Sequence, residues 1–224
     1  VYTLDDAKAA TQALDSGDSV TESFTVQVSA NGETATADAV FNITGADDAA
    51  VVSGDITGGA TEGDVGDAPV TATGTLTITD VDADDSPSFA DVASTAGDNN
   101  YGTFELTSGT WTYTLDQSAV QDLDAGDEVT DTTTFTAADG TTQQVIVTIT
   151  GTDDLAVVTG DTTGAVTEGD IGDAAVTASG TLAITDVDAD DSPSFADVTS
   201  TVGDSGFGSF ELTNGTWTYT LEQS

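Results

Sequence analysis

Several residue types are scarce in this chain of 224 residues, and two that carry much of protein chemistry are missing. Cysteine and histidine are absent, and Lys8 is the sole basic residue. Without cysteine there is no disulfide framework and no thiol chemistry. Without either residue type, a zinc centre is disfavoured and nucleophilic catalysis lacks its usual base, which leaves paired carboxylates as the one route to acid–base catalysis.

Basic charge is almost missing as well, because 41 acidic residues stand against one basic residue and the formal net charge is −40. Phosphate binding requires clusters of Lys or Arg, so we expect no nucleic-acid partner. No hydrophobic run approaches the roughly 18 residues of a membrane span, so we expect no membrane insertion. The hydrophobic content of 37% is enough for a folded core. Self-repulsion at this charge makes screening cations part of the expected environment.

The sequence contains a long tandem repeat. The block DVDADDSPSFADV occurs at residues 80–92 and again, unchanged, at residues 186–198. The copying extends further, since residues 49–118 align with residues 155–224 with 17 differences in 70 positions. Solenoid units are shorter and need their neighbours to bury a core, whereas about 100 residues suffice for one β-sandwich. The repeat therefore predicts tandem domains arranged as beads on a string.

Both ends of the sequence fall inside a repeat, because residues 1–4 match residues 112–115 and the final residues match the segment that ends at Ser118. We therefore expect a segment of a longer protein. The expected parts are the C-terminal half of a repeat at 1–48, a complete repeat at 49–154 and the N-terminal half of a further repeat at 155–224. The missing halves come either from the same chain or from a neighbouring chain, and the sequence leaves both open.

The local patterns are those of strands and tight turns. Residues 75–79 alternate between Thr and an aliphatic residue, a period of two. Hairpin turns are expected at residues 108–109 and 139–140, where other copies have Asn-Gly, the preferred type I′ pair. Helical turns are expected only at residues 118–123 and 5–14. The prediction is an all-β fold of tandem immunoglobulin-like or cadherin-like β-sandwich domains.

The repeat also resembles a known family. The segments GTLTITDVDADD, YGTFELTSGTWTYTL and ITGTDD, found in this order, are similar to the VCBS repeat of very large bacterial adhesins. The resemblance is close over residues 74–154 and partial elsewhere. It implies immunoglobulin-like or cadherin-like extender domains in a secreted, calcium-dependent adhesin or biofilm-matrix protein of the bacterial cell surface.

Carboxylates are the residues able to carry chemistry. Dense carboxylate oxygens suit Ca²⁺, which accepts six to eight oxygen ligands at flexible geometry. We therefore expect calcium at the acidic motifs TDVDAD and TEGD and at the Asp-Asp pairs between repeats. The candidate ligands are Asp47, Asp48, Glu62, Asp64, Asp80, Asp82, Asp84, Asp153, Asp154, Glu168, Asp170, Asp186, Asp188 and Asp190. The alternative is that these residues are solvated turn formers.

Chain direction through a sandwich assigns these carboxylates to junctions between domains. The strand at residues 180–185 should run back toward the preceding linker, which places the residues after it at that junction. The expected members of this junction are Asp153, Asp154, Asp186, Asp188, Glu62 and Asp64. The expected members of the preceding junction are Asp47, Asp48, Asp80 and Asp82. Glu168 and Asp170 are expected at the opposite end of the last sandwich.

Three function classes follow, and none of them is an enzyme, because an acidic block copied in each repeat suits a structural element better than an active site. The first is an extracellular extender whose calcium-bound junctions hold neighbouring repeats rigid. The second is a subunit of a filament in which copies of the chain exchange strands. The third is a carbohydrate-binding module, although alternating Trp111, Tyr113, Trp217 and Tyr219 are expected in the core rather than on a sugar platform.

Overall fold

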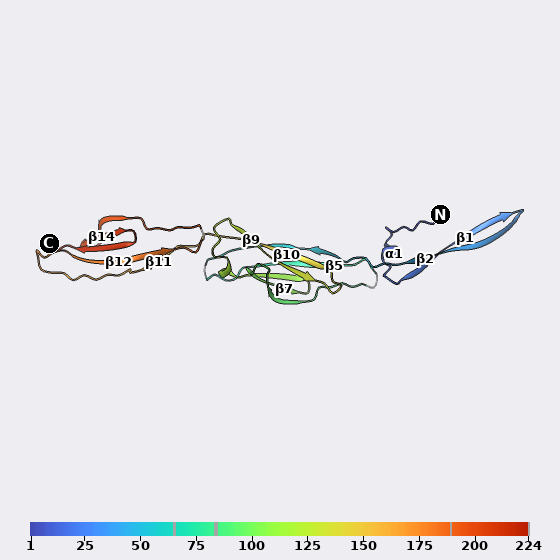
Figure 1. Cartoon of the computed structure of the whole chain (residues 1–224), viewed down its shortest axis with the longest axis horizontal. Helices are drawn as coiled ribbons and strands as arrows, with labels where there is room; N and C mark the ends of the chain where they lie inside the picture. The colour runs from blue at the N-terminus through green and yellow to red at the C-terminus, as the bar shows by residue number, and fades with distance from the viewer. Residues whose placement is uncertain (65, 83–84, 189, 224) are drawn as a thin grey trace. The chain divides into compact units, whose positions relative to one another are not determined.

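Strands make up nearly all the regular structure of the chain (Figure 1). The computed structural model describes residues 1–64, 66–82, 85–188 and 190–223. Its helical elements are one α-helical turn, α1 (Ala9–Gln12), and one 3-10 turn, η1 (Gln117–Ala119). Both overlap the segments expected to be helical, and the predicted all-β class is confirmed. None of the described helices has the length and apolar character needed to cross a membrane.

The described strands form one two-stranded, one three-stranded and two five-stranded sheets. The strands are β1 (Ser19–Ala30), β2 (Glu33–Thr44), β3 (Val51–Gly54), β4 (Thr57–Thr61), β5 (Thr71–Thr79), β6 (Val92–Ala96), β7 (Gly102–Thr107), β8 (Thr110–Leu115), β9 (Glu128–Thr136), β10 (Thr142–Thr150), β11 (Val157–Gly160), β12 (Val176–Thr185), β13 (Val198–Val202), β14 (Gly208–Thr213) and β15 (Thr216–Leu221). The sheet orders are β1-β2, β4-β10-β9, β3-β5-β8-β7-β6 and β11-β12-β15-β14-β13.

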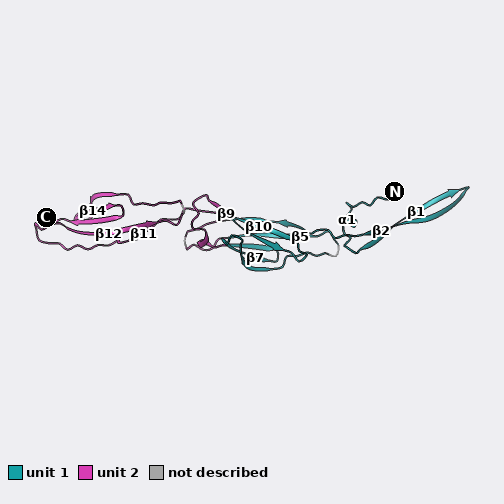
Figure 2. Cartoon of the chain, viewed as in Figure 1, with its two compact units in different colours: residues 1–59, 71–114, 130–148 teal, residues 60–70, 115–129, 149–224 magenta. Residues whose placement is uncertain are grey.

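The chain divides into two compact units (Figure 2). The first comprises Val1–Gly59, Thr71–Thr114 and Thr130–Thr148, and the second comprises Ala60–Val70, Leu115–Val129 and Ile149–Ser224. The boundaries of these compact units do not coincide with the boundaries of the sequence repeats. The repeat boundaries expected after residues 48 and 154 stay a prediction.

The main hydrophobic core lies in the first unit, between the sheet that contains β7 and β8 and the hairpin formed by β9 and β10. Phe104, Trp111, Tyr113, Val145 and Val147 are each at most 1% exposed. These side chains alternate along their strands, so each strand turns one apolar face inward. The core position expected for Trp111 and Tyr113 is confirmed.

One carboxylate is part of this core. Asp131, on β9, is fully buried, and its two oxygens accept hydrogen bonds from five donors. The donors are the backbone N–H groups of Asn99, Tyr101, Gly102 and Thr132 and the hydroxyl of Tyr113. Because its acceptor capacity is used by the protein, Asp131 holds the loop before β7 in place without a cation.

The second unit contains the sheet formed by β11 to β15, which repeats the sheet order of β3 to β8 strand for strand. In both sheets a tryptophan lies opposite a glycine, Trp111 opposite Gly74 and Trp217 opposite Gly180. A Cβ atom at either glycine would lie 2.6 Å from the indole ring. Only glycine therefore leaves room for the tryptophan in each copy.

Candidate metal centres

The first acidic cluster lies in the first unit, where β5 ends. The Asp80 carboxylate accepts a hydrogen bond from the N–H of Asp82 (3.0 Å), which turns the chain directly after the strand. This turn buries Asp82 to 3% exposure. Its Oδ2 atom accepts from the N–H of Asp48 (2.7 Å), while its Oδ1 atom is buried without a hydrogen-bond partner. A buried carboxylate in this state costs free energy unless a cation completes its surroundings.

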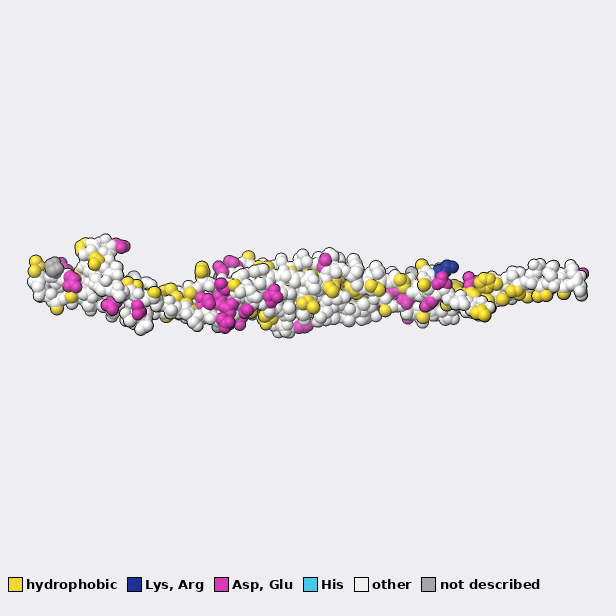
Figure 3. All heavy atoms as spheres, turned by 90° about the horizontal axis from the view of Figure 1, so that it is seen from above, with side chains coloured by type: hydrophobic (Ala, Val, Ile, Leu, Met, Phe, Trp, Pro, Cys, Tyr) yellow, Lys and Arg dark blue, Asp and Glu magenta, His cyan; other side chains and the backbone are white. Residues whose placement is uncertain are grey.

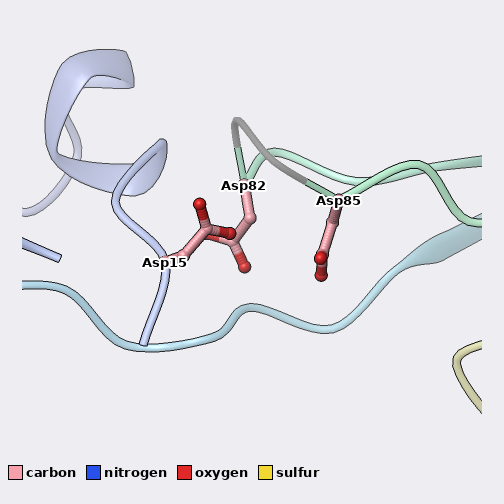
Figure 4. Close-up of side chains that lie close together, drawn as sticks. All are labelled: Asp15, Asp82 and Asp85. Carbon is pink, nitrogen blue, oxygen red and sulfur yellow. The ribbon is translucent and has the colours of Figure 1, made fainter. Parts of the chain in front are cut away.

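Asp15 and Asp85 bring two more carboxylates to Asp82 (Figure 4), and the nearest oxygens of the three lie within 4.8 Å of one another. Asp15 is half-buried in the loop after α1, and Asp85 is exposed. Desolvation by neighbouring groups, followed by the charges of Asp80 and Asp82, raises the pKa of Asp85. Like charges held this close favour a bound cation.

The second cluster lies in the second unit, after β12, and repeats this arrangement. The Asp186 carboxylate accepts from the N–H of Asp188 (3.2 Å), and Asp188 is 4% exposed. Its Oδ2 atom accepts from the N–H of Asp154 (2.7 Å), and its Oδ1 atom is buried without a partner. Asp191 joins them with a carboxylate oxygen inside the same 4.8 Å limit. Desolvation by neighbouring groups, then the charges of Asp186 and Asp188, raises the pKa of Asp191.

A loop with the sequence Leu-Asp-X-Gly-Asp accompanies each cluster, at residues 14–18 and 123–127. In the second loop, partial burial and then the charges of Asp190 and Asp188 raise the pKa of Asp124. The linker holds each loop by the same hydrogen bond, since Asp47 accepts from the N–H of Ser16 (2.8 Å) and Asp153 accepts from the N–H of Ala125 (2.9 Å). Loop, linker and acidic turn are thus tied together in each copy.

Glu62 lies in the second unit near the second cluster and is 4% exposed. Its carboxylate accepts from the side-chain amide of Gln121 (2.9 Å) and from the N–H of Thr152 (3.2 Å). Burial, reinforced by the charges of Asp154 and Asp188, raises the pKa of Glu62 to about 7. The expected assignment of Glu62 to a calcium junction between repeats stays a prediction. Asp64 is exposed and lines a cavity of about 230 Å³ with Asp154, Leu155, Val157, Thr185 and Val187.

Other candidates lie elsewhere. Glu168 and Asp170 are exposed, and Glu168 lines a hollow with Leu221, which pairs with Val176 at the start of β12. They therefore lie near the opposite end of β12 from Asp186 and do not join the second cluster. Asp190 is exposed near Asp124, and Asp84 lies outside the described residues.

Three cluster members, Asp15, Asp85 and Asp191, were not among the candidate ligands from the sequence. Neither was Asp124, which lies near the second cluster. Asp85 and Asp191 follow the TDVDAD motif directly, so a wider reading of that motif would have included them. The repeated Leu-Asp-X-Gly-Asp segment was the available signal for Asp15 and Asp124. Whether any of these residues binds calcium stays a prediction.

Comparisons with known proteins place the chain in no family. No family model matches the sequence, and no curated protein matches it significantly. Among solved structures, PcdhgB3 EC1-4 matches at 13% identity and a TM-score of 0.44, covering 99% of this chain and 50% of that one. A Ca²⁺-stabilized adhesin with which an Antarctic bacterium binds ice matches at 17% identity and a TM-score of 0.26, covering 90% and 48%.

An endo-fucoidan hydrolase of glycoside hydrolase family 107 also matches, at 12% identity and a TM-score of 0.25, covering 92% of this chain and 30% of the hydrolase. The chain thus spans half or less of the length of these three proteins. At such identities and TM-scores the likenesses assign neither an activity nor a ligand to this chain.

Proposed function

We propose that this chain is an extender segment of a long, repetitive extracellular protein of a bacterial cell surface, an adhesin or a biofilm-matrix protein, made rigid by Ca²⁺ at its acidic clusters. The observation that carries the proposal is the pair of buried aspartates, Asp82 and Asp188. Each sits at the same place in its repeat, gives one oxygen to the backbone of the linker and keeps the other buried without a partner.

The donor set fits calcium. Both clusters offer carboxylate oxygens, and Ca²⁺ takes six to eight such oxygens, whereas Zn²⁺ favours nitrogen and sulfur ligands. Asp15, Asp82 and Asp85 would hold the ion in the first cluster, and Asp186 and Asp188 with their neighbours would do so in the second. A solvated acidic turn explains exposed carboxylates well, but it leaves a buried carboxylate oxygen without a partner unexplained.

Calcium would act on stiffness through three segments. The acidic turn, the linker and the Leu-Asp-X-Gly-Asp loop already share hydrogen bonds in each cluster. Without a cation, mutual repulsion of the carboxylates opposes these bonds. A bound ion would neutralise the repulsion and join carboxylates from separate segments, so that the hinge between neighbouring repeats loses its freedom.

The competing functions have less support. A carbohydrate-binding module needs exposed aromatic rings, yet Trp111 and Tyr113 are 0% exposed and Trp217 is 6% exposed. A hydrolase acting through two carboxylates would need one dedicated pair, and the buried aspartates here occur once per repeat. We therefore propose a role that is not enzymatic.

The test combines calcium titration with thermal unfolding and small-angle scattering. In the wild-type chain, chelator should lower the Tm, because an ion at 100 times its Kd stabilises the folded state by about 3 kcal/mol. The variant Asp186→Asn with Asp188→Asn should lose calcium at one cluster and scatter as a more flexible particle, with both cores still folded.

The matched control is Asp204→Asn with Glu211→Gln, which removes the same charge from exposed positions of the same sheet region. It should keep the wild-type calcium stoichiometry. Calcium binding at these aspartates would be contradicted by the same calcium stoichiometry in wild type, variant and control. It would also be contradicted by a wild-type Tm that does not change when chelator is added.

A further inference from the structure

Two hairpin turns carry the dipeptide Asn-Gly, which is chemically reactive. Asn31-Gly32 joins β1 to β2, and Asn214-Gly215 joins β14 to β15. The backbone nitrogen after an asparagine can attack its side-chain amide, and glycine hinders this attack least because it has no Cβ atom. The two asparagines have φ angles of 53° and 46°, and both glycines have positive φ as well. Both turns therefore have type I′ geometry, and they differ in what surrounds them.

Neighbouring segments hold the second turn in place. The N–H of Asn214 donates to the Asp197 carboxylate (3.0 Å), and the carbonyl of Gly215 accepts from the N–H of Leu182 (2.7 Å). Gly215 is buried, and a Cβ atom there would lie 2.8 Å from the carbonyl oxygen of Leu182. The corresponding turn at residues 108–109 makes the same two hydrogen bonds. The repeated sheet thus docks this turn in both copies.

The first turn has no such contacts. Asn31 and Gly32 are both exposed, and a Cβ atom at Gly32 would meet no other atom within 4 Å. Among the described residues, no hydrogen bond beyond those of the β1–β2 pair involves either of them. Figure 3 shows mainly backbone and uncharged polar side chains, in white, at this tip of the hairpin. Only the hairpin's own pairing restrains the turn.

The length of the hairpin accounts for this exposure. Its pair Val28–Ala35 corresponds to Ala137 and Thr141 of the β9–β10 hairpin, which turns through residues 138–140. Those three residues are exposed although that hairpin packs in the core of the first unit. The β1–β2 hairpin continues for two more residue pairs, to Ala30–Glu33, before it turns. Its turn therefore lies beyond the part of a hairpin that core packing covers.

We propose that Asn31 is a site of spontaneous modification, which becomes aspartate and isoaspartate because its turn is undocked. The backbone nitrogen of Gly32 loses its proton to hydroxide and bonds to the Cγ atom of Asn31, ammonia leaves, and a succinimide ring remains. Water then opens the ring at either carbonyl, so the net reaction consumes one water and releases one ammonia. This modification goes beyond the proposed extender function and does not depend on it.

Docking controls the rate because the ring closes only when the backbone rotates out of the type I′ conformation. At Asn214 this rotation also breaks the two docking hydrogen bonds, whereas Asn31 has none to lose. Asn31 should therefore react at least about tenfold faster than Asn214 in the folded chain. The product adds a negative charge beside Glu33. Isoaspartate also lengthens the backbone by one methylene, which a two-residue turn does not accommodate.

Incubation of the folded chain at mildly alkaline pH in water labelled with heavy oxygen tests the proposal, with peptide mapping by mass spectrometry as the readout. Below the Tm, Asn31 should take up label at least about tenfold faster than Asn214. In denaturant the two rates should become similar, because both sites are then unfolded Asn-Gly. Equal rates in the folded chain, or an Asn31 that reacts only after unfolding, overturns the proposal.

The variant Asp197→Ala tests whether docking is the cause. Loss of this hydrogen bond should raise the rate at Asn214 about fivefold and leave the rate at Asn31 unchanged. The control Asp204→Ala removes the same charge from an exposed position of the same sheet region and leaves the hydrogen bonds of the turn in place. Both rates should stay as in wild type. Equal acceleration by the two variants would assign the difference to charge and overturn the proposal.

Discussion

At the scale of single residues, the protein holds two kinds of buried carboxylate. Asp131 accepts hydrogen bonds from five donors, so the fold itself satisfies its charge. Asp82 and Asp188 each accept one and retain a buried oxygen without a partner. Burial alone does not distinguish these cases, since all three are at most 4% exposed. The number of hydrogen-bond donors distinguishes them: a carboxylate with all its acceptor sites occupied is structural, whereas a buried carboxylate with an unoccupied oxygen is a candidate cation ligand.

Glu62 gives a pH dependence at this scale. Its pKa rises from 4.5 to about 7 on folding, chiefly through burial, so the folded state binds a proton more tightly than the unfolded state. In chelator, the stabilisation of the folded state by protonated Glu62 is therefore complete below about pH 4.5 and is lost as pH rises through about 7. The free energy of unfolding falls by up to roughly 3 kcal/mol over this range. Denaturant unfolding at a series of pH values measures the change.

Glu62→Gln removes this titrating group and is the matched variant. Its free energy of unfolding should change less between pH 4.5 and pH 7 than that of wild type. If Glu62 keeps an ordinary pKa in the folded chain, the free energy of unfolding will depend on pH equally in the variant and in wild type, and that result would contradict the prediction.

At the scale of elements, one comparison shows what a strand requires. Thr57–Thr61 forms β4, whereas the corresponding residues 163–167 form no strand, although the two segments are similar in sequence. β4 is hydrogen-bonded to β10, whereas among the described residues no strand pairs with residues 163–167. Backbone N–H and C=O groups need partners, so the strand exists where its partner exists.

Hydrogen exchange tests this dependence. Amides of residues 57–61 should exchange at least about tenfold more slowly than those of residues 163–167. As an internal control, β5 and β12 should be protected to similar degrees, because each has a paired neighbour. Equal exchange in the two test segments would refute the dependence.

Local pattern was sufficient for much of the fold. The turns at Asn31 and Ser108 have both central residues at positive φ, as a type I′ turn requires. At residues 139–140 only Gly140 has positive φ, so that hairpin closes through a different turn. The TDVDAD spacing led to Asp82 and Asp188. Asp15 was missed because its proximity to Asp82, which lies 67 positions later in the sequence, depends on the path of the chain between them, which no local pattern reports.

At the scale of the whole molecule, a net charge of −40 acts on every folding and binding step. Folding brings the carboxylates of each cluster together, so repulsion weighs more on the folded state than on the unfolded state. A monovalent salt lowers this repulsion by screening all charges alike. In the proposed function, calcium would act at the clusters by direct coordination, which screening does not reproduce.

The two effects separate in thermal unfolding. In chelator, raising NaCl from 0.01 to 1 M shortens the Debye length from about 30 Å to about 3 Å and should raise the Tm progressively. Millimolar CaCl₂ should raise the Tm beyond NaCl or MgCl₂ at the same ionic strength, because Mg²⁺ requires tighter octahedral geometry and keeps its waters. With calcium bound, the dependence on NaCl should flatten, since the closest charges are already neutralised. If the three salts stabilise equally at matched ionic strength, the clusters are solvated acidic turns and the calcium-stiffened extender fails.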